Sequence, residues 1–303
     1  MSSPHLVAAA AQRALWPGLV MAVLGAVAFS GKAIIVKLAY RYGVDAVTLI
    51  MYRMLFALPM FLLLSWWSGR GKPPLTRRDW VVVSGLGFSG YYLASFLDFA
   101  GLQYITAGLE RLILYLNPTL VLALGVVLFK QKVTRRQLIS LAVSYCGVLL
   151  VFGHEVTLLG RDVALGAALV FASMVSYALY LVYSGEEVKR LGALRLTGIA
   201  TSIACVLCIA QFFVLRPVSA MAVAPEVIWL SVLNATLCTF CPVLLVMMAI
   251  ERIGAPMTTQ VGMFGPLSTI LMGVVILGEP FTAWIAAGTV LVLAGIWLLA
   301  RWR

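Results

Sequence analysis

Ten long apolar runs, separated by short polar connections, make up almost the whole of this 303-residue chain. A helix needs roughly 20 apolar residues to cross the hydrocarbon core of a bilayer, where it satisfies its own backbone hydrogen bonds. The sequence therefore predicts an all-α membrane protein with ten transmembrane helices. Their approximate ranges are 15–37, 46–67, 80–101, 105–129, 135–153, 163–184, 194–215, 227–249, 254–278 and 282–300.

The composition agrees with lipid as the main solvent. Hydrophobic residues make up 63% of the chain and charged residues 11%, with a mean hydropathy of +1.04, whereas soluble domains carry about 25% charged residues. The net charge of +11 comes from basic clusters between the apolar runs. Because no polar segment carries a basic face interleaved with aromatic residues, we exclude nucleic acid as a partner.

The distribution of basic residues predicts the orientation. Cytoplasmic loops of membrane proteins carry an excess of Lys and Arg. A cytoplasmic N-terminus leaves only Lys37, Arg41, Arg161 and Arg216 on the outer side. We therefore predict a multi-pass protein of the plasma membrane (the inner membrane in bacteria), with both termini and a tail at residues 1–14 in the cytoplasm.

The two halves of the chain match each other at a constant offset of 148 residues. Each half holds five predicted helices, and an odd number forces the two copies to cross the membrane in opposite senses. We predict two inverted-topology five-helix repeats at residues 15–153 and 154–303, an architecture typical of carriers. The matched pairs include Gly18 with Gly166, Ile105 with Ile253, Pro118 with Pro266, and Gly147 with Gly295.

Pro118 and Pro266 lie at equivalent places in the fourth and ninth predicted helices. A proline inside a helix removes one backbone hydrogen bond and kinks the helix. Prolines are also common and tolerated in membrane helices. Their symmetric placement favours two functional helix kinks.

Five charged residues lie within the first-half helices, where a charge is costly unless it is paired or faces a cavity. None of their counterparts at the offset of 148 is charged. Three interpretations are open: a salt-bridge network joining the outer helix ends, an outer gate whose ion pairs break, or a proton-coupling or substrate-binding group. The five residues are Lys32, Arg53, Asp98, Glu110 and Arg111.

Polar and aromatic side chains in both halves form a predicted substrate pathway. Hydroxyl, amide and ring groups suit a zwitterionic or aromatic solute, although each such residue also occurs in ordinary helix packing. The predicted pathway residues are Tyr91, Tyr92, Ser95, Tyr115, Asn117, Ser176, Tyr177, Tyr180, Thr239, Thr258, Gln260 and Phe264.

The five-plus-five repeat, the paired prolines and the turn at 277–282 (Leu-Gly-Glu-Pro-Phe-Thr) together resemble the drug/metabolite transporter superfamily, in its ten-helix branch with two EamA-type repeats. The first repeat departs from this pattern, because residues 129–132 read Phe-Lys-Gln-Lys without an acidic residue. The resemblance implies a transporter, since members move amino acids, metabolites, nucleotide sugars or toxic cations. Within the superfamily the chain looks most like bacterial amino-acid exporters.

Other function classes find less support. Residues 87–90 match the GxSG pattern of intramembrane serine proteases, but that chemistry needs a membrane histidine, and the chain has only His5 and His154 outside the core of the bilayer. Two CxxC pairs, Cys205/Cys208 and Cys238/Cys241, are interpreted as small apolar helix residues, with a metal or redox role as the alternative. We predict no metal site and no cofactor.

The sequence thus predicts a secondary carrier of small organic solutes, working by alternating access as a monomer within the bilayer. The resemblance favours export of aromatic or neutral amino acids or related metabolites. The alternatives are export of other metabolites or drugs, a channel, and a membrane-embedded lipid-handling enzyme.

Overall fold

The computed structural model describes residues 4–130, 134–262 and 265–301, and these residues form helices without any strand. Eight helices are long and apolar enough to cross a membrane, and shorter apolar helices lie at Gly265–Leu277 and Ala283–Leu298. Together they account for ten membrane segments within the described residues, which confirms the predicted fold class.

In the first half, some membrane segments are divided into consecutive helical pieces. The segments in chain order are α1 (Pro4–Tyr40), α2 (Ala46–Gly69), α3 (Arg77–Gly87) continued by the π-helix η1 (Phe88–Leu93) and α4 (Ala94–Gly101), α5 (Ala107–Leu114), α6 (Asn117–Phe129) and α7 (Arg135–Leu159).

The second half repeats this order. Its elements are α8 (Asp162–Leu191), α9 (Ala193–Leu215), the 3-10 helix η2 (Val218–Met221), α10 (Pro225–Ala235) continued by the π-helix η3 (Thr236–Phe240) and α11 (Cys241–Gly262), α12 (Gly265–Met272) continued by the π-helix η4 (Gly273–Leu277), and α13 (Ala283–Arg301).

Equivalent irregularities recur at the predicted offset. The π-helices η1 and η3 begin at Phe88 and Thr236, so they are 148 residues apart. π-helices are rare and occur mostly as single-turn bulges at functional sites. The repeat therefore extends to local departures from α-helical geometry as well as to sequence.

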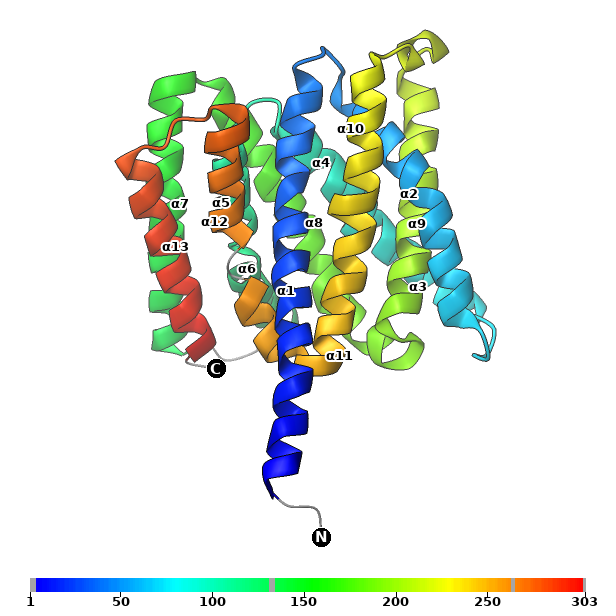
Figure 1. Ribbon diagram of the computed structural model, residues 1–303. Coiled ribbons are helices and arrows are strands. Elements are labelled where there is room, and N and C mark those ends of the chain that lie inside the picture. The colour runs from blue at the N-terminus through cyan, green and yellow to red at the C-terminus, as the bar shows by residue number, and fades with distance from the viewer. Residues whose placement is uncertain (1–3, 131–133, 263–264, 302–303) are drawn as a thin grey trace.

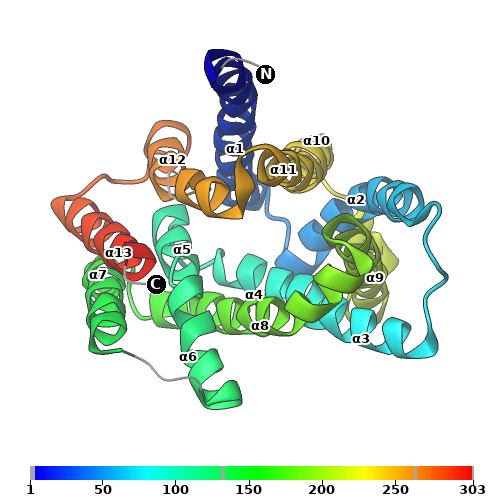
Figure 2. The ribbon, with the colours of Figure 1, turned by 90° about the horizontal axis from the view of Figure 1, so that it is seen from below.

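The helices are arranged about a pseudo-two-fold relation (Figure 2). Equivalent helices pack against each other at the two ends of the assembly, α2 on α9 and α7 on α13. Between them lie two rows. The first row holds α10–α11, α1 and α12, and the second row holds α3–α4, α8 and α5–α6. Each row is built around the first helix of one repeat and two helices of the other, so the repeats are interlocked.

Small residues permit this close packing where α7 crosses α13. A Cβ atom added to Gly147 would lie 2.6 Å from the carbonyl oxygen of Gly288, and one added to Gly295 would lie 2.8 Å from that of Ser140. Because Gly295 and Gly288 are the counterparts of Gly147 and Ser140, the same contact occurs twice. Small residues at such crossings let backbones approach closely in membranes.

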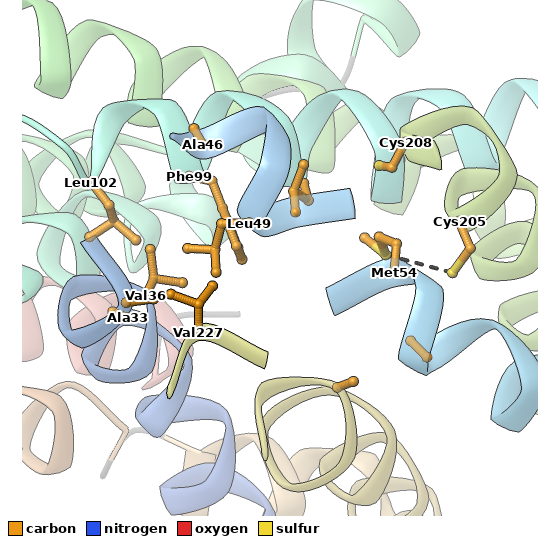
Figure 3. Close-up of a cluster of buried hydrophobic side chains, with 14 of the residues drawn as sticks. Ala33, Val36, Ala46, Leu49, Met54, Phe99, Leu102, Cys205, Cys208 and Val227 are labelled. Atoms are coloured by element: carbon orange, nitrogen blue, oxygen red, sulfur yellow. Dashed lines mark hydrogen bonds between the residues drawn. The ribbon is translucent and has the colours of Figure 1, made fainter. Parts of the chain in front are cut away.

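A buried apolar cluster joins α1, α2, α4, α9 and α10 (Figure 3). Leu49 and Phe99 are among its fully buried members, and the thiol of Cys205 lies 3.6 Å from the sulfur of Met54. Cys205 and Cys208 are free thiols within this cluster, so the first CxxC pair lies in an apolar environment.

Two predicted helix boundaries differ from the structure. The tail predicted at 1–14 is helical from Pro4 onward, and its run of alanines at 8–11 has the highest helix propensity. Figure 1 shows this part of α1 extending beyond the other helices, at the end of the molecule where α13 also finishes.

The break predicted at 250–253 is also absent, because α11 continues to Gly262. In the first repeat the equivalent break precedes Thr106, whose hydroxyl accepts a hydrogen bond from the backbone N–H of Leu109 and begins α5. The counterpart of Thr106 is Gly254, which offers no capping side chain.

Pro118 was predicted to kink a continuous helix, but α5 ends at Leu114 and α6 begins at Asn117. Pro118 is the second residue of α6 and Pro266 is the second residue of α12. In the first turn of a helix the missing backbone N–H is not needed, so proline is accommodated there. Pro118 therefore marks the start of a new helix, whereas Pro266 directly follows residues 263–264, which lie outside the described residues.

Asp45 caps the N-terminal end of α2. Its carboxylate accepts hydrogen bonds from the backbone N–H groups of Val47 and Thr48 and lies 3.2 Å from the guanidinium of Arg216 at the end of α9. Partial burial raises the pKa of Asp45, but these hydrogen bonds and the arginine lower it by more, so the net pKa is lowered. The cap holds α2 and α9 together.

Candidate functional site

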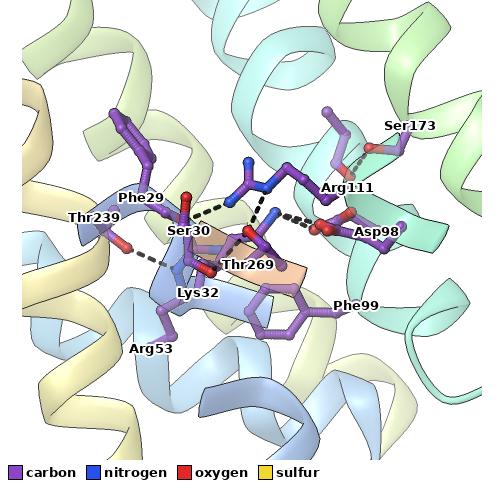
Figure 4. Close-up of polar contacts among 12 residues, drawn as sticks. Phe29, Ser30, Lys32, Arg53, Asp98, Phe99, Arg111, Ser173, Thr239 and Thr269 are labelled. Atoms are coloured by element: carbon purple, nitrogen blue, oxygen red, sulfur yellow. Dashed lines mark hydrogen bonds and ion pairs between the residues drawn. The ribbon is translucent and has the colours of Figure 1, made fainter. Parts of the chain in front are cut away.

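The five charged side chains predicted within helices gather where the two rows meet, and together they are called the charge site (Figure 4). Lys32 of α1 belongs to the first row, and Asp98 of α4 and Glu110 of α5 belong to the second. The Lys32 ammonium lies 2.5 Å from Asp98 Oδ2 and 3.2 Å from Glu110 Oε1. One ammonium group therefore bridges two carboxylates across the contact between the rows.

The two arginines are held by groups other than these carboxylates. Arg111 donates from Nε to the hydroxyl of Thr269 at 2.9 Å and from Nη2 to the carbonyl oxygen of Phe29 at 2.9 Å. These bonds tie α5 to α12 and to α1. Arg111 thus acts as a polar link between the rows.

Arg53 of α2 is almost fully buried. It donates from Nε to the hydroxyl of Thr239 at 3.0 Å, and its guanidinium carbon lies 5.1 Å from the centre of the Phe99 ring. Thr239 in turn donates to the carbonyl oxygen of Asn234, five residues earlier in the chain. The π-helix η3 thereby presents Thr239 to the arginine.

Some oxygens of the two carboxylates receive no hydrogen bond from the described residues. Asp98 Oδ1 and Glu110 Oε2 are buried and form no hydrogen bond with described residues, Glu110 Oε1 has only its ion-pair contact with Lys32, and Arg53 Nη1 is an unused donor. A buried polar atom without a hydrogen-bond partner costs about 1–3 kcal/mol of folding free energy, and a charged one costs more. The charge site can therefore accept a further hydrogen-bond donor.

A second cluster, the tyrosine site, consists of Tyr91 of η1 with Tyr177 and Tyr180 of α8. The hydroxyl oxygens of Tyr91 and Tyr180 lie 3.2 Å apart, and their rings are edge-on at 5.1 Å. Tyr177 stacks on Tyr180 at 5.6 Å. At the repeat offset, Tyr180 is the counterpart of Lys32 and Tyr91 the counterpart of Thr239, so this site is the pseudo-symmetric equivalent of part of the charge site.

Other predicted pathway residues lie around these two sites. Ser176 donates to the carbonyl oxygen of Ser89 at 2.8 Å, which joins α8 to η1. Tyr92 packs against Phe88 with ring centres 5.3 Å apart, and the half-buried Ser95 follows on α4.

Two of the remaining pathway residues, Tyr115 and Asn117, lie where α5 ends and α6 begins. The Tyr115 hydroxyl, between α5 and α6, donates to the carbonyl oxygen of Gly262 at the end of α11, and the buried amide oxygen of Asn117 has no hydrogen-bond partner among the described residues. Thr258 is buried on α11. The side chain of Gln260 and all of Phe264 lie outside the described residues.

A third cluster of polar side chains lies at the start of α5 and was not predicted from the sequence. Thr106 donates its hydroxyl to Glu155 of α7, and Glu279 accepts from the backbone N–H of Ala107 at 2.9 Å. The Lys37 ammonium donates to the carbonyl oxygen of Ile105 at 2.9 Å. Two carboxylates from other segments thus stabilise the positive end of this helix dipole. Glu155 and Glu279 lie beyond the ends of the predicted helices, so they are not among the charges predicted within helices.

An apolar pocket of about 600 Å³ lies between α2 and α11. It contains none of the predicted pathway residues. Leu63 and Trp67 on its wall are largely exposed on the surface of the helix bundle, so the pocket opens sideways. It is lined by Met60, Leu63, Leu64, Trp67, Leu194, Phe240, Leu244, Met248 and Arg252.

The comparison with known families decides what class of protein carries these sites. Residues 16–153 and 164–301 each match the EamA-like transporter family. The chain belongs to this family. As an EamA-like transporter it carries two copies of the family unit, whose limits agree with the two halves of the interlocked fold.

Relatives of this EamA-like transporter are also named as transporters. The uncharacterized transporter YcbK of Bacillus subtilis (strain 168) is 29% identical over 270 residues, which cover 86% of each chain. The uncharacterized transporter YyaM of the same strain is 29% identical over 264 residues, or 85% of this chain and 81% of the relative. These names and the family assign the chain to transporters and not to enzymes.

One solved crystal structure of a protein superposes on 94% of this chain and 97% of its own with a TM-score of 0.63. At 16% identity this likeness concerns the fold alone. The fold of this EamA-like transporter therefore has an experimentally determined counterpart.

Proposed function

We propose that this chain is a secondary carrier that exports aromatic or neutral amino acids, or related small metabolites, by alternating access. The observation that carries the proposal is the bridge from Lys32 to Asp98 and Glu110 across the contact between the two rows. Buried charges within a membrane are retained where they serve a pathway or a moving contact. Inverted repeats move against each other around a site near the middle of the membrane.

The chemistry of the two sites supports an amino acid as the solute. Unused carboxylate oxygens at Asp98 and Glu110 suit an α-ammonium group, and the unused Nη1 of Arg53 suits a carboxylate. The rings of Tyr91 and Tyr180 offer an edge and a face on which an aromatic side chain packs. The charged groups and the rings together favour aromatic and neutral amino acids as substrates.

The test is transport by purified protein in liposomes, using a panel of radiolabelled amino acids. We expect saturable flux of a subset, competition by unlabelled analogues, and faster uptake when unlabelled substrate is loaded inside. Such exchange is a property of carriers and not of open channels. A folded protein that moves none of the panel above empty liposomes would refute the amino-acid substrate.

A second candidate substrate class is apolar drugs or metabolites, and the pocket between α2 and α11 favours it. That pocket is apolar, opens sideways and has Arg252 on its wall. The same liposomes loaded with a fluorescent apolar anion and a fluorescent apolar cation distinguish the two classes. Flux of either dye without flux of any amino acid would favour this alternative.

We also propose that both termini face the cytoplasm, so that the turn between α2 and α3 does too. The support is the clustering of basic residues on that side and the common end shared by the start of α1 and the finish of α13 (Figure 1). In a variant without native cysteines, Arg78→Cys should resist a membrane-impermeant thiol reagent added outside intact cells. Ala222→Cys at the opposite end should react, and the reverse pattern would refute the orientation.

A further inference from the structure

We infer that the pocket between α2 and α11 binds one anionic phospholipid, with an acyl chain between the helices and the phosphate group at Arg252. The inference goes beyond the proposed substrate and does not depend on it. The pocket has a volume of about 600 Å³ and opens on the side of the bundle. Leu63 and Trp67 at its mouth are 63% and 61% exposed, whereas Leu64 on its inner wall is 4% exposed.

The length of the pocket matches one leaflet of a bilayer. Two of its lining residues, Phe240 and Arg252, lie on the continuous helix formed by η3 and α11. At a rise of about 1.5 Å per residue, the helix from 240 to 252 spans about 18 Å. Half of the hydrocarbon core of a bilayer is about 15 Å thick. An acyl chain of one leaflet therefore fits along the pocket.

The walls of the pocket suit methylene groups. Apart from Arg252, the residues that line it are methionine, leucine, phenylalanine and tryptophan. An empty space against such walls loses the dispersion contacts that a packed chain would make. Acyl chains are the apolar molecules at highest concentration beside a membrane protein, so they are the natural occupants of a pocket that opens sideways.

One end of the pocket lies at the level of the lipid headgroups. The helices α2 and α11 both run toward the end of the molecule where α1 begins (Figure 1), so Trp67 and Arg252 mark the same end of the pocket. Next to Trp67, the exposed ring of Trp66 lies 3.7 Å from the guanidinium carbon of Arg70. Tryptophan and arginine are the residues that anchor helices at the membrane–water interface.

The charge at this end favours an anionic headgroup. Arg252 is exposed, and its Nη1 donates to the carbonyl oxygen of Met248 at 3.0 Å, which holds the guanidinium beside the pocket. A guanidinium group binds phosphate through two parallel hydrogen bonds. The turn after α2 adds Arg70 and Lys72, and basic residues near a membrane surface attract anionic lipid. Phosphatidylglycerol should therefore bind more tightly than the zwitterionic phosphatidylcholine.

Native mass spectrometry of the whole chain in detergent tests the headgroup contact. The probes are phosphatidylglycerol and phosphatidylcholine with identical acyl chains. Wild type should retain one phosphatidylglycerol at lower lipid concentration than phosphatidylcholine, and Arg252→Gln should weaken phosphatidylglycerol binding about fivefold. Arg135→Gln, at the exposed start of α7, is the matched control and should bind as wild type does. Equal wild-type affinities for the two lipids, or equal losses in both variants, would overturn the assignment.

A second variant tests the acyl-chain contact. Leu244→Trp places a larger ring in the pocket, which has room for it, so the unfolding midpoint without added lipid should stay near that of wild type. Phosphatidylglycerol should raise the midpoint of wild type and not that of Leu244→Trp. An equal rise in both would overturn the site. Loss of apolar-dye binding without loss of lipid binding in Leu244→Trp would assign the pocket to a solute instead. A lipid-free dimer that Leu244→Trp disrupts would assign it to a second copy of the chain.

Discussion

The charge site and the tyrosine site occupy pseudo-symmetric places in one fold but contain opposite chemistry. Lys32 in one corresponds to Tyr180 in the other, and Thr239 corresponds to Tyr91. The first site is held by ion pairs at 2.5 and 3.2 Å, and the second by ring contacts and a hydroxyl pair at 3.2 Å. The duplicated backbone is therefore a common scaffold on which the two halves carry different polar groups.

This difference shows how an inverted repeat becomes electrically asymmetric without losing its packing. The glycine contacts between α7 and α13 and the paired π-helices occur in both halves. The ion pairs of the charge site come from helices of the first half only, and they lie where the two rows touch. The packing that both halves need is kept, and the binding chemistry diverges.

The largest expected effect comes from removing the shared cation. Lys32→Met leaves two carboxylates buried without a counterion, which costs about 3–5 kcal/mol of folding free energy. The midpoint of thermal unfolding in detergent should fall strongly. Adding Asp98→Asn and Glu110→Gln to Lys32→Met should restore much of the loss. An unchanged midpoint for Lys32→Met alone would show that the ion pairs do not hold the rows together.

Arg111→Gln should have the next largest effect, because it removes the charged link from α5 to Thr269 and Phe29. Hydrogen bonds to a charged group contribute about 1.5–3 kcal/mol each. Transport in liposomes should fall, and Arg111→Lys should recover only part, since lysine lacks the planar fork that reaches both acceptors. Wild-type transport rates in both Arg111→Gln and Glu110→Gln would exclude gate and coupling roles together.

Replacing a glycine by alanine next to each site compares how tightly the two sites are packed. A Cβ atom at Gly90 would collide with the Tyr180 ring, whereas one at Gly31 would meet only the thiol of Cys238 at 3.0 Å. Gly90→Ala should cost about 1–3 kcal/mol through overpacking, and Gly31→Ala should cost less. Unfolding midpoints of both variants check the order. Combining Gly90→Ala with Tyr180→Ala should relieve the collision, and equal losses at both glycines would contradict the stated packing.

The smallest effect is expected from Tyr91→Phe, which removes one hydroxyl and keeps the ring. The loss of a neutral hydrogen bond costs about 0.5–1.5 kcal/mol. Transport of an aromatic amino acid should change more than transport of a small neutral one, as measured by competition in the liposome assay. An identical change for both substrates would remove the tyrosine site from substrate selection.

The sequence by itself determined the ten membrane segments, the offset of 148 and the transporter family, because long apolar runs have one stable solution in lipid. It also identified the five charges within helices as a group. Pro118 marked the place where the fourth predicted segment is interrupted, although its position did not distinguish a kink from a new helix.

Only the tertiary structure decided which charges meet. Lys32 and Glu110 are far apart in the chain, and their contact depends on how α1 and α5 rotate and cross, which hydropathy does not encode. The same holds for Arg53, which bonds to Thr239 from the other repeat, and for Glu279, which stabilises the start of α5. In lipid the apolar faces are nearly equivalent, so these polar contacts and the small residues between helices select one packing.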